Sequence, residues 1–507
     1  MAQKVLPYKY EVKEEKTGLT ALGGLPTYLD LAAASGLMKS IERNLRIRTG
    51  DQGWTDRQMV MSLVMLNLAG GDCVEDIEKI EGDEGLCQIV RKAETYGLSR
   101  KAKALKKKRW RKGQKRTFPS VSSIFRYLSK FHNEEAEEKR EEGKAYIPAR
   151  NEHIKELARI NSELIGYAME KGKKETATLD MDATITATNK EKALYSYKGE
   201  KGYQPLNTYW YERGVMVHTE FRDGNVPAGY EQLRVFKEAL GNLPEGVEKV
   251  RLRSDTAGYQ HDLLKYCNSG ENRRFEKIEF AIGCDVTKEF RKAVMNLGEQ
   301  DWKPLYRDEN GKKKETGRQW AEVCFVPNKI CSSSKEHKYR YIATREEMKQ
   351  KELPTMEKKE EDYPFPVIEM REQRYKVFGI VTNMDWSADV LIPWMYKRCG
   401  KSEEAHAVIK NDLAGGSFPS GDFGENAAWW WITILAYNLN MLMKRLVLGK
   451  SWINKRMKAI RFGIINIAAR VMERSRCLYV RISGKHPSSG LLIEARRRIA
   501  QLATVPG

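Results

Sequence analysis

Carboxylates are the side chains of this chain whose types and spacing most directly suggest chemistry. Asp180 and Asp182 lie two residues apart in an alternating segment, so on a β-strand their side chains would share one face. Asp255 ends a later strand-like segment, and Glu403 and Glu404 stand in a segment of helical character. Ligands of open α/β sheets gather at the carboxyl ends of strands, and oxygen ligands suit Mg²⁺. Three such carboxylates could hold two divalent ions about 3.5–4 Å apart, an arrangement that supports in-line phosphoryl displacement.

The segments that carry these carboxylates have the order of an α/β domain. A strand is predicted over 176–186, followed by two strands within 207–221 around a turn at Arg213-Gly214. The elements predicted next are a helix over 228–241, a strand over 248–255, a helix over 258–268 and a strand over 277–286. This is the element order of a ribonuclease-H-like core, although many α/β domains begin in the same way. The chain has 69 acidic residues, so order and spacing alone do not assign a function.

The flanking segments differ from this domain in composition and in predicted secondary structure. Strand-like runs fill the region before a helix that is predicted over 387–411, and helical or basic segments occupy both ends of the chain. We predict a helical DNA-binding and dimerisation region (1–145), the first part of a ribonuclease-H-like α/β core (146–286), a β-rich insertion (287–385), the second part of the core with the helix of Glu403 (386–449) and a basic helical C-terminal region (450–507).

Positive charge is concentrated in two segments of the chain. The formal net charge is +20, and residues 91–116 hold 13 Lys and Arg with one Glu. Residues 444–498 hold 15 Lys and Arg with two Glu, which leaves the rest of the chain mildly acidic. Both segments contain aromatic residues, among them Trp110, Trp452 and Tyr479. Two localised basic segments favour contact with a polyanion, and nucleic acid is the partner that this pattern predicts.

Cysteine spacing and hydropathy indicate a soluble protein of a reducing cytoplasm. The eight cysteines are scattered without a Cys-x-x-Cys pair, a pattern that favours neither a zinc ribbon nor a secreted disulfide framework. The N-terminal residues lack the apolar core of a signal peptide. The most apolar stretch, 427–443, contains Asn438 and Asn440 and is predicted to be a buried helix rather than a membrane span.

Several separated motifs resemble one known family. They are LDMDAT (179–184), YKGEKGYQPL (197–206), RDGN (222–225), RSDTAGY (253–259) and NAAWWWITILAYNL (426–439). In this order they resemble the bacterial DDE transposases of the insertion-sequence-1380 family, over most of the chain from about residue 53 to about residue 449. The resemblance implies a ribonuclease-H-like catalytic core with a β-strand insertion before the catalytic Glu.

The resemblance also implies roles for the carboxylates. Asp182 matches the first family Asp because Asp-Ala-Thr follows the strand, with Asp180 as the alternate. Asp255 matches the second Asp, and Glu403 matches the Glu, with Glu404 as the alternate if the helical register slips. These residues are then the catalytic, metal-binding set, with Mg²⁺ or Mn²⁺ as the cofactor and two ions per active site.

Related transposases carry a Tyr, Arg, Glu, Lys pattern along one helix. Tyr396, Glu403 and Lys410 are each seven residues apart, which would place them on one helical face. The position of the family Arg is Cys399, and Arg398 lies one place early. Tyr396, Arg398 and Lys410 are therefore expected to contact DNA. The other expected DNA contacts are Lys106, Lys107, Lys108, Arg109, Arg111 and Lys112.

The sequence thus predicts a DNA transposase. It would bind the terminal inverted repeats of its insertion sequence, cleave the ends with two metal ions and transfer the 3′-OH ends to target DNA. Partners would be double-stranded DNA and a second copy of the chain in a synaptic homodimer, in a bacterial cytoplasm and associated with the nucleoid. Two other readings stay open, a catalytically inactive DNA-binding regulator derived from a transposase and a structure-specific nuclease.

Overall fold

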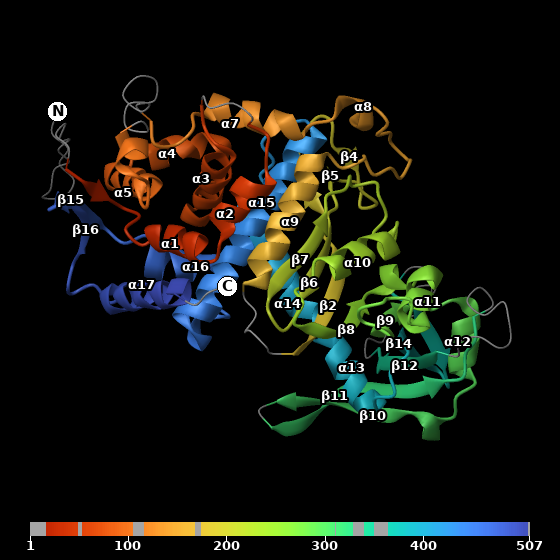
Figure 1. The fold of residues 1–507 in the computed structure, drawn as a ribbon. Coiled ribbons are helices and arrows are strands. Elements are labelled where there is room, and N and C mark those ends of the chain that lie inside the picture. Colours follow the sequence, from red (N-terminus) through yellow and green to blue (C-terminus); the bar gives the residue numbers. More distant parts are fainter. Residues whose placement is uncertain are drawn as a thin grey trace, which may run out of the picture. The chain divides into compact units, whose positions relative to one another are not determined.

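The computed structural model describes residues 17–48, 53–104, 116–167, 174–309, 311–327, 339–348 and 363–504. The chain divides into two compact units, each assembled from segments that are distant in the sequence (Figure 1). Unit 1 contains the chain up to Lys130 together with 412–414 and 442–507. Unit 2 contains 131–411 and 415–441, so it carries all of the predicted catalytic carboxylates.

Unit 2 is built on a ten-stranded mixed sheet. The strand order is β10–β11–β12–β14–β9–β8–β2–β6–β7, and β13 pairs with β14. The strands are β2 (Glu175–Ala183), β6 (Leu206–Trp210), β7 (Val215–Glu220), β8 (Val247–Ser254), β9 (Glu279–Cys284), β10 (Lys303–Glu309), β11 (Lys312–Val323), β12 (Arg340–Glu347), β13 (Val367–Met370) and β14 (Gln373–Thr382). At the centre, β2 is parallel to β8 and antiparallel to β6, and β8 is parallel to β9.

The helices of unit 2 include the two that the sequence predicts between the central strands, α10 and α11. They are α8 (Glu134–Glu137), α9 (Glu152–Gly166), α10 (Gln232–Gly241), α11 (His261–Ser269), α12 (Lys288–Met295), α13 (Ala388–Tyr396), α14 (Arg398–Ala407) and α15 (Phe423–Leu442), and a small sheet is formed by β3 (Thr186–Ala187), β5 (Lys201–Tyr203) and β4 (Leu194–Tyr195). Three long strands, α10, β8, α11 and β9 appear in this sequence, so the predicted α/β order is confirmed. Leu179 and Met181 of β2 are fully buried, as expected for the central strand of a covered sheet.

The Trp-rich helix is a buried element of unit 2. Its residues Trp429, Trp430 and Trp431 are at most 1% exposed. Asn438, a polar residue in this apolar run, pairs with the edge strand β7: its side chain accepts from the Met216 N–H at 2.9 Å and donates to the Met216 carbonyl at 2.8 Å. A buried amide needs such partners, which explains its presence in the core. Within the described part of the chain, no helix combines the length and apolarity that crossing a membrane requires.

The strands of the predicted β-rich insertion continue the central sheet. β14 runs antiparallel to β9, with Val381 opposite Ile282, and β12, β11 and β10 follow outward. Their apolar face carries α13, because Trp320, Ile342 and Ile380 pack in one core cluster with Leu391 and Met395. The insertion therefore supports the helix that precedes Arg398 and Glu403.

One predicted element is wrong. The single helix expected over 387–411 is broken into α13 and α14, since Cys399 is extended and Gly400 has φ +106°, a left-handed conformation that favours glycine. Lys410 lies beyond α14 in a π-helical turn, η6 (Val408–Asp412). Tyr396, Glu403 and Lys410 therefore do not share one helical face, and a seven-residue spacing carries no geometric meaning across the break.

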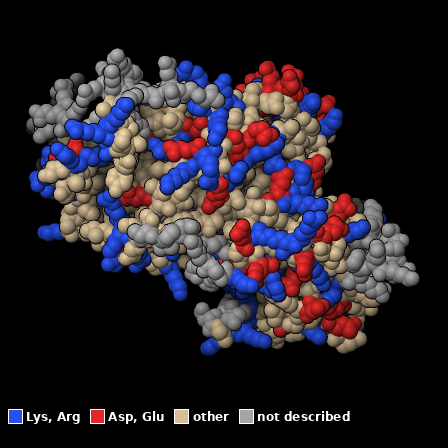
Figure 2. Space-filling model, in the orientation of Figure 1, with Lys and Arg blue, Asp and Glu red and all other residues tan. Residues whose placement is uncertain are grey.

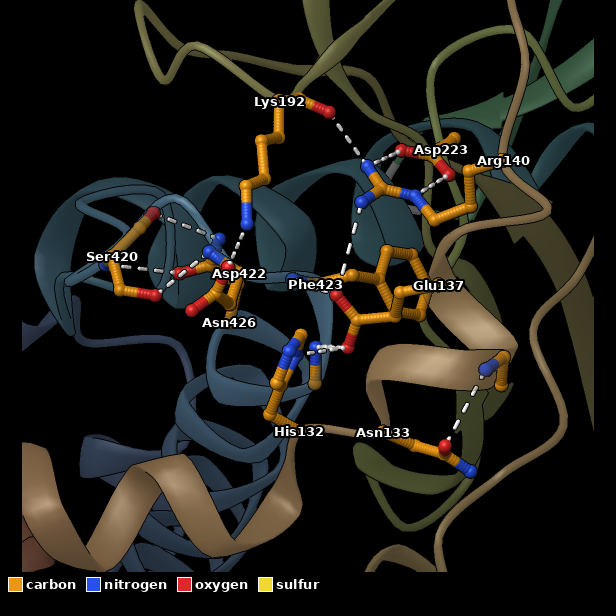
Figure 3. A network of polar contacts seen from close by, with 12 residues as sticks. His132, Asn133, Glu137, Arg140, Lys192, Asp223, Ser420, Asp422, Phe423 and Asn426 are labelled. Carbon is orange, nitrogen blue, oxygen red and sulfur yellow. Dashed lines mark hydrogen bonds and ion pairs between the residues drawn. The ribbon is translucent and has the colours of Figure 1, made fainter.

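A polar network fastens the N-terminus of α15 to α8 (Figure 3). The Glu137 carboxylate accepts hydrogen bonds from the backbone N–H groups of Phe423 at 2.9 Å and Gly424 at 2.8 Å. The His132 ring lies 2.8 Å from the same carboxylate, and Arg140 makes a two-pronged ion pair with Asp223. The first N–H groups of a helix lack intrahelical partners, so Glu137 acts as a cap supplied by another segment.

Glu137→Ala is expected to loosen the start of α15. Charge-assisted hydrogen bonds contribute about 1.5–3 kcal/mol each, and loss of this cap should accelerate amide exchange in 423–426 by roughly 30-fold. Hydrogen exchange followed by mass spectrometry measures this directly. Glu135→Ala, which removes an exposed carboxylate of the same helix, serves as the control. Unchanged exchange at 423–426 in Glu137→Ala would contradict the capping role.

Unit 1 joins the two ends of the chain. Its helices are α1 (Pro26–Ala34), α2 (Leu37–Asn44), α3 (Asp56–Ala69), α4 (Ile77–Glu81), α5 (Glu84–Thr95), α7 (Val121–Leu128), α16 (Met457–Ile460) and α17 (Ser489–Thr504), and its sheet has the order β1 (Leu19–Thr20), β15 (Ala469–Arg474), β16 (Cys477–Ile482). α1 packs against α17, so N-terminal and C-terminal helices share a core. The hairpin β15–β16 was not expected in the C-terminal region. Its turn residues Ser475 and Arg476 are left-handed without Gly or Asn, so the usual hairpin signal is missing.

Candidate active site

Asp182 and Asp255 lie side by side at the ends of two neighbouring parallel strands. Met181 of β2 is paired with Ser254 of β8, so the two aspartates occupy the next positions along each chain. The Asp255 side chain also accepts a hydrogen bond from the Ala257 N–H at 3.0 Å, which orients it at the start of a short 3-10 turn. This is the carboxyl end of the parallel strands, where open α/β sheets collect their ligands.

Glu403 is the third member of the carboxylate cluster that also contains Asp182 and Asp255. It lies on α14, which packs against β2. The pKa of Asp182 is raised to about 6, chiefly by burial; Arg398 opposes the shift, and the charges of Asp255 and Glu403 add to it. The charges of Asp255 and Glu403 therefore both act on Asp182. Glu403 is exposed, so its carboxylate is accessible from solvent. The neighbouring Glu404 is also exposed; of the two, Glu403 is among the leading charges that raise the pKa of Asp182.

The Arg398 side chain lies within this carboxylate cluster. Its guanidinium Nη1 lies 3.3 Å from the Asp182 carboxylate, and its side chain is 12% exposed. Burial lowers the pKa of Arg398, but the surrounding negative charges, led by Asp182 and Asp255, together raise it above its usual value. Although Arg398 does not stand at the family Arg position, its cation pairs with Asp182 and partly neutralises the site.

Asp180, the alternate for Asp182, is occupied by an ion pair. It is fully buried, and both of its oxygens accept hydrogen bonds from Arg253, at 2.6 Å and 2.9 Å. A carboxylate held in this way has no accessible oxygen to offer to a metal ion. The geometry therefore favours Asp182 as the ligand and Asp180 as a structural residue.

The remaining residues of the expected DNA-contacting pattern are half-buried. The Tyr396 hydroxyl lies 3.1 Å from the Thr344 hydroxyl, and burial raises its pKa. Lys410 donates to the Ile185 carbonyl at 3.1 Å, and burial lowers its pKa. His406 is buried, and burial together with Lys410 and Arg398 lowers its pKa to about 3, so its ring is neutral. Tyr396 and Lys410 thus each contact a protein atom and remain partly exposed, and their DNA contacts stay predictions.

The expected basic DNA contacts lie outside the described residues. They are Lys106, Lys107, Lys108, Arg109, Arg111 and Lys112. Their role stays a prediction from the sequence.

The residue that sequence reasoning missed is Arg253. Its only signal in the sequence was its place two residues before Asp255, which matches the place of Asp180 two residues before Asp182.

The donor set of the candidate site suits divalent cations. Asp182, Asp255 and Glu403 offer carboxylate oxygens, the ligands that Mg²⁺ and Mn²⁺ prefer. Among the described residues, the trio whose ligand atoms all lie within 4.8 Å of one another is a different one, His132, Glu137 and Asp422. There the oxygens of Glu137 already bind backbone N–H groups, and Lys192 lies 2.5 Å from Asp422.

Comparison with known proteins decides the family. A family model described as transposase DDE domain, group 1, matches residues 9–363 and 365–504. The chain belongs to this family. The function of this family is DNA transposition. Membership implies a metal-dependent enzyme that cleaves and joins DNA. A search of curated proteins found no match.

Among solved structures, this DDE transposase chain is similar to a piggyBac transposase in a synaptic complex with hairpin DNA. The sequence identity is 11%, the TM-score is 0.40, and the similarity covers 88% of this chain and 81% of that chain.

Proposed function

We propose that this protein is a DNA transposase of the insertion-sequence-1380 kind, with a ribonuclease-H-like core, that cleaves the ends of its own element and transfers the 3′-OH ends to target DNA. The observation that carries the proposal is the convergence of Asp182, Asp255 and Glu403 from two parallel strand ends and a helix. Family membership and the order of the central strands support the same reading.

The three carboxylates would hold the divalent ions. When bound, a pair of such ions activates water or a 3′-OH and stabilises the leaving oxygen of an in-line displacement. The chain's own residues prepare the site: the Ala257 N–H orients Asp255, and Arg398 offsets the negative charge that would otherwise repel a phosphate. Uncompensated, the carboxylates would repel DNA, so activity should require added metal.

A basic surface of unit 1 supports the DNA-binding part of the proposal. Figure 2 shows Lys and Arg side chains around α17 and the strands β15 and β16. The exposed cations of this region are Arg470, Arg474, Arg476, Arg481, Lys485, Arg496 and Arg497. Arg470 lies directly opposite Arg481 in the antiparallel pair. Like charges in this position destabilise a sheet, so the pair favours a role that requires a polyanion.

The double variant Arg470→Gln/Arg481→Gln is expected to bind end DNA about 10-fold more weakly at low salt. Each lost phosphate contact should reduce the slope of log K against log salt by about 0.9, so the double variant should lose up to about 1.8. Fluorescence anisotropy over a salt series measures both quantities. Arg159→Gln, an exposed arginine of α9, is the control. An unchanged slope would place the DNA contact elsewhere.

The proposed activity is tested with the full chain and labelled DNA that carries the terminal repeats flanking its gene. Strand cleavage at the repeat ends is expected with Mg²⁺ and not with EDTA. Binding without cleavage would favour the second candidate, an inactive regulator. Cutting that follows branched DNA structure and ignores the end sequence would favour a nuclease. A homodimer that holds two ends is expected in the complex, as measured by light scattering.

A further inference from the structure

Arg253 links three elements around the proposed metal ligands: its own strand β8, the neighbouring strand β2 and the helix α13 that precedes α14. It lies on β8, two residues before Asp255, and is fully buried. Its Nε and Nη2 donate to the two oxygens of Asp180, which stands on β2 two residues before Asp182. Because Asp180 and Arg253 are register partners in the parallel pair, this ion pair fixes the alignment of the two strand ends.

The third donor of Arg253 is directed at the helix that precedes Glu403. Nη1 donates to the Trp394 carbonyl at 2.5 Å. Trp394 lies in the last turn of α13, where carbonyls lack intrahelical donors. The chain beyond it is broken at Cys399 and Gly400, so helical continuity does not orient α14. The contact at Trp394 holds the C-terminal turn of α13, from which the chain continues to Arg398 and, past the break, to Glu403.

Aromatic rings keep this guanidinium in place. Arg253 lies over the Tyr211 ring at 4.4 Å and over the Trp394 ring at 4.9 Å. A buried ion pair seldom stabilises a fold more than apolar residues of the same volume would. Its advantage is directional, since the planar fork of an arginine fixes several partners at once, which a lysine cannot do.

We propose that Arg253 is a positioning residue that sets the geometry of Asp182, Asp255 and Glu403, with Asp180 as its counter-ion. The inference rests on the proposed function, because it assigns these carboxylates to one metal site. It extends that function by naming the residue on which the spacing of the metal ligands depends.

The test compares three variants in the full chain bound to end DNA. Arg253→Lys keeps the charge but removes the fork. Asp180→Asn/Arg253→Gln removes both charges, so no unpaired charge remains buried, but it leaves the Trp394 carbonyl without its present donor. Arg251→Lys is the matched control, because Arg251 lies two residues earlier on β8, contacts Glu279 at 2.6 Å and stacks on Trp386.

Mn²⁺ affinity, measured by electron paramagnetic resonance, is the primary readout, with the melting temperature and the kcat and KM of cleavage beside it. Both Arg253 variants should bind Mn²⁺ at least 10-fold more weakly and lower kcat at least 100-fold with KM for DNA unchanged. The double variant should keep its melting temperature within about 4 °C of the unaltered protein. Arg251→Lys should change none of these.

Several results would overturn the inference. One is a folded Arg253→Lys or double variant with normal Mn²⁺ affinity, since Arg253 would then be structural only. Another is a loss of Mn²⁺ affinity and kcat in Arg251→Lys that is as large as the loss in the Arg253 variants. A third is an unaltered protein that binds no Mn²⁺ at these carboxylates. Mn²⁺ binding that depends on Arg253, in a protein that does not cleave DNA, would contradict the proposed function and leave the positioning role supported.

Discussion

Asp182→Asn is expected to lower the rate of DNA-end cleavage by at least about 1000-fold, which corresponds to about 4 kcal/mol of lost transition-state stabilisation. The substitution keeps the size of the side chain but removes the negative charge of Asp182. The charges of Asp255 and Glu403 raise the pKa of this carboxylate, so all three belong to one cluster. Asp255→Asn and Glu403→Gln should have effects of the same size, because a metal pair requires all three ligands. Rates of strand cleavage under single-turnover conditions measure the loss.

Binding of end DNA should be retained in these variants. Removing a carboxylate from a site that approaches phosphate should leave the affinity unchanged or slightly higher. Glu404→Gln is the matched control, since Glu404 is an exposed neighbour of Glu403 on the same helix. Normal cleavage by Glu403→Gln together with loss in Glu404→Gln would show that Glu404 is the ligand. Normal cleavage by Asp182→Asn would contradict the site itself.

Gly24→Ala is expected to destabilise unit 1 by at least about 3 kcal/mol. Gly24 lies where the N-terminal segment crosses the C-terminal one, and its N–H donates to the Ile465 carbonyl at 3.2 Å. A Cβ atom at this position would lie 1.6 Å from the Ile464 carbonyl oxygen and 2.7 Å from its carbon. Both atoms belong to backbone, so the two segments must separate to admit a methyl group.

The effect of Gly24→Ala is measured as the melting temperature of the full chain and as proteolysis of residues 17–48. Gly490→Ala is the matched control in the same unit, because it lies at the start of α17 with no atom within 4 Å of a new Cβ. That variant should be neutral or slightly more stable, since alanine favours a helix over glycine. Equal stability of the two variants would contradict the close packing of the two chain ends.

The core was accessible to sequence reasoning because its signals are local. Alternation around Leu179 and Met181 predicted β2, and the turn at Arg213-Gly214 predicted the hairpin of β6 and β7. The placement of Asp182 and Asp255 at adjacent strand ends follows from that order and from the parallel pairing.

The parts that sequence reasoning missed depend on long-range register or on a single backbone angle. The pairing of Asp180 with Arg253 requires strands that are separated by more than 60 residues to align in one register. The break before Glu403 depends on one left-handed glycine, Gly400, inside a segment of otherwise helical composition. Contacts of this kind arise from tertiary packing, which a local pattern does not encode.

Metal-directed cleavage of the protein backbone tests the central claim most directly. Fe²⁺ replaces Mg²⁺ in the complex with end DNA, and ascorbate with peroxide then generates radicals that cut the chain near the bound ion. We predict cuts close to Asp182, Asp255 and Glu403, and their loss in Asp182→Asn. Cuts confined to the neighbourhood of His132, Glu137 and Asp422, the other group of metal-binding residue types, would contradict the account.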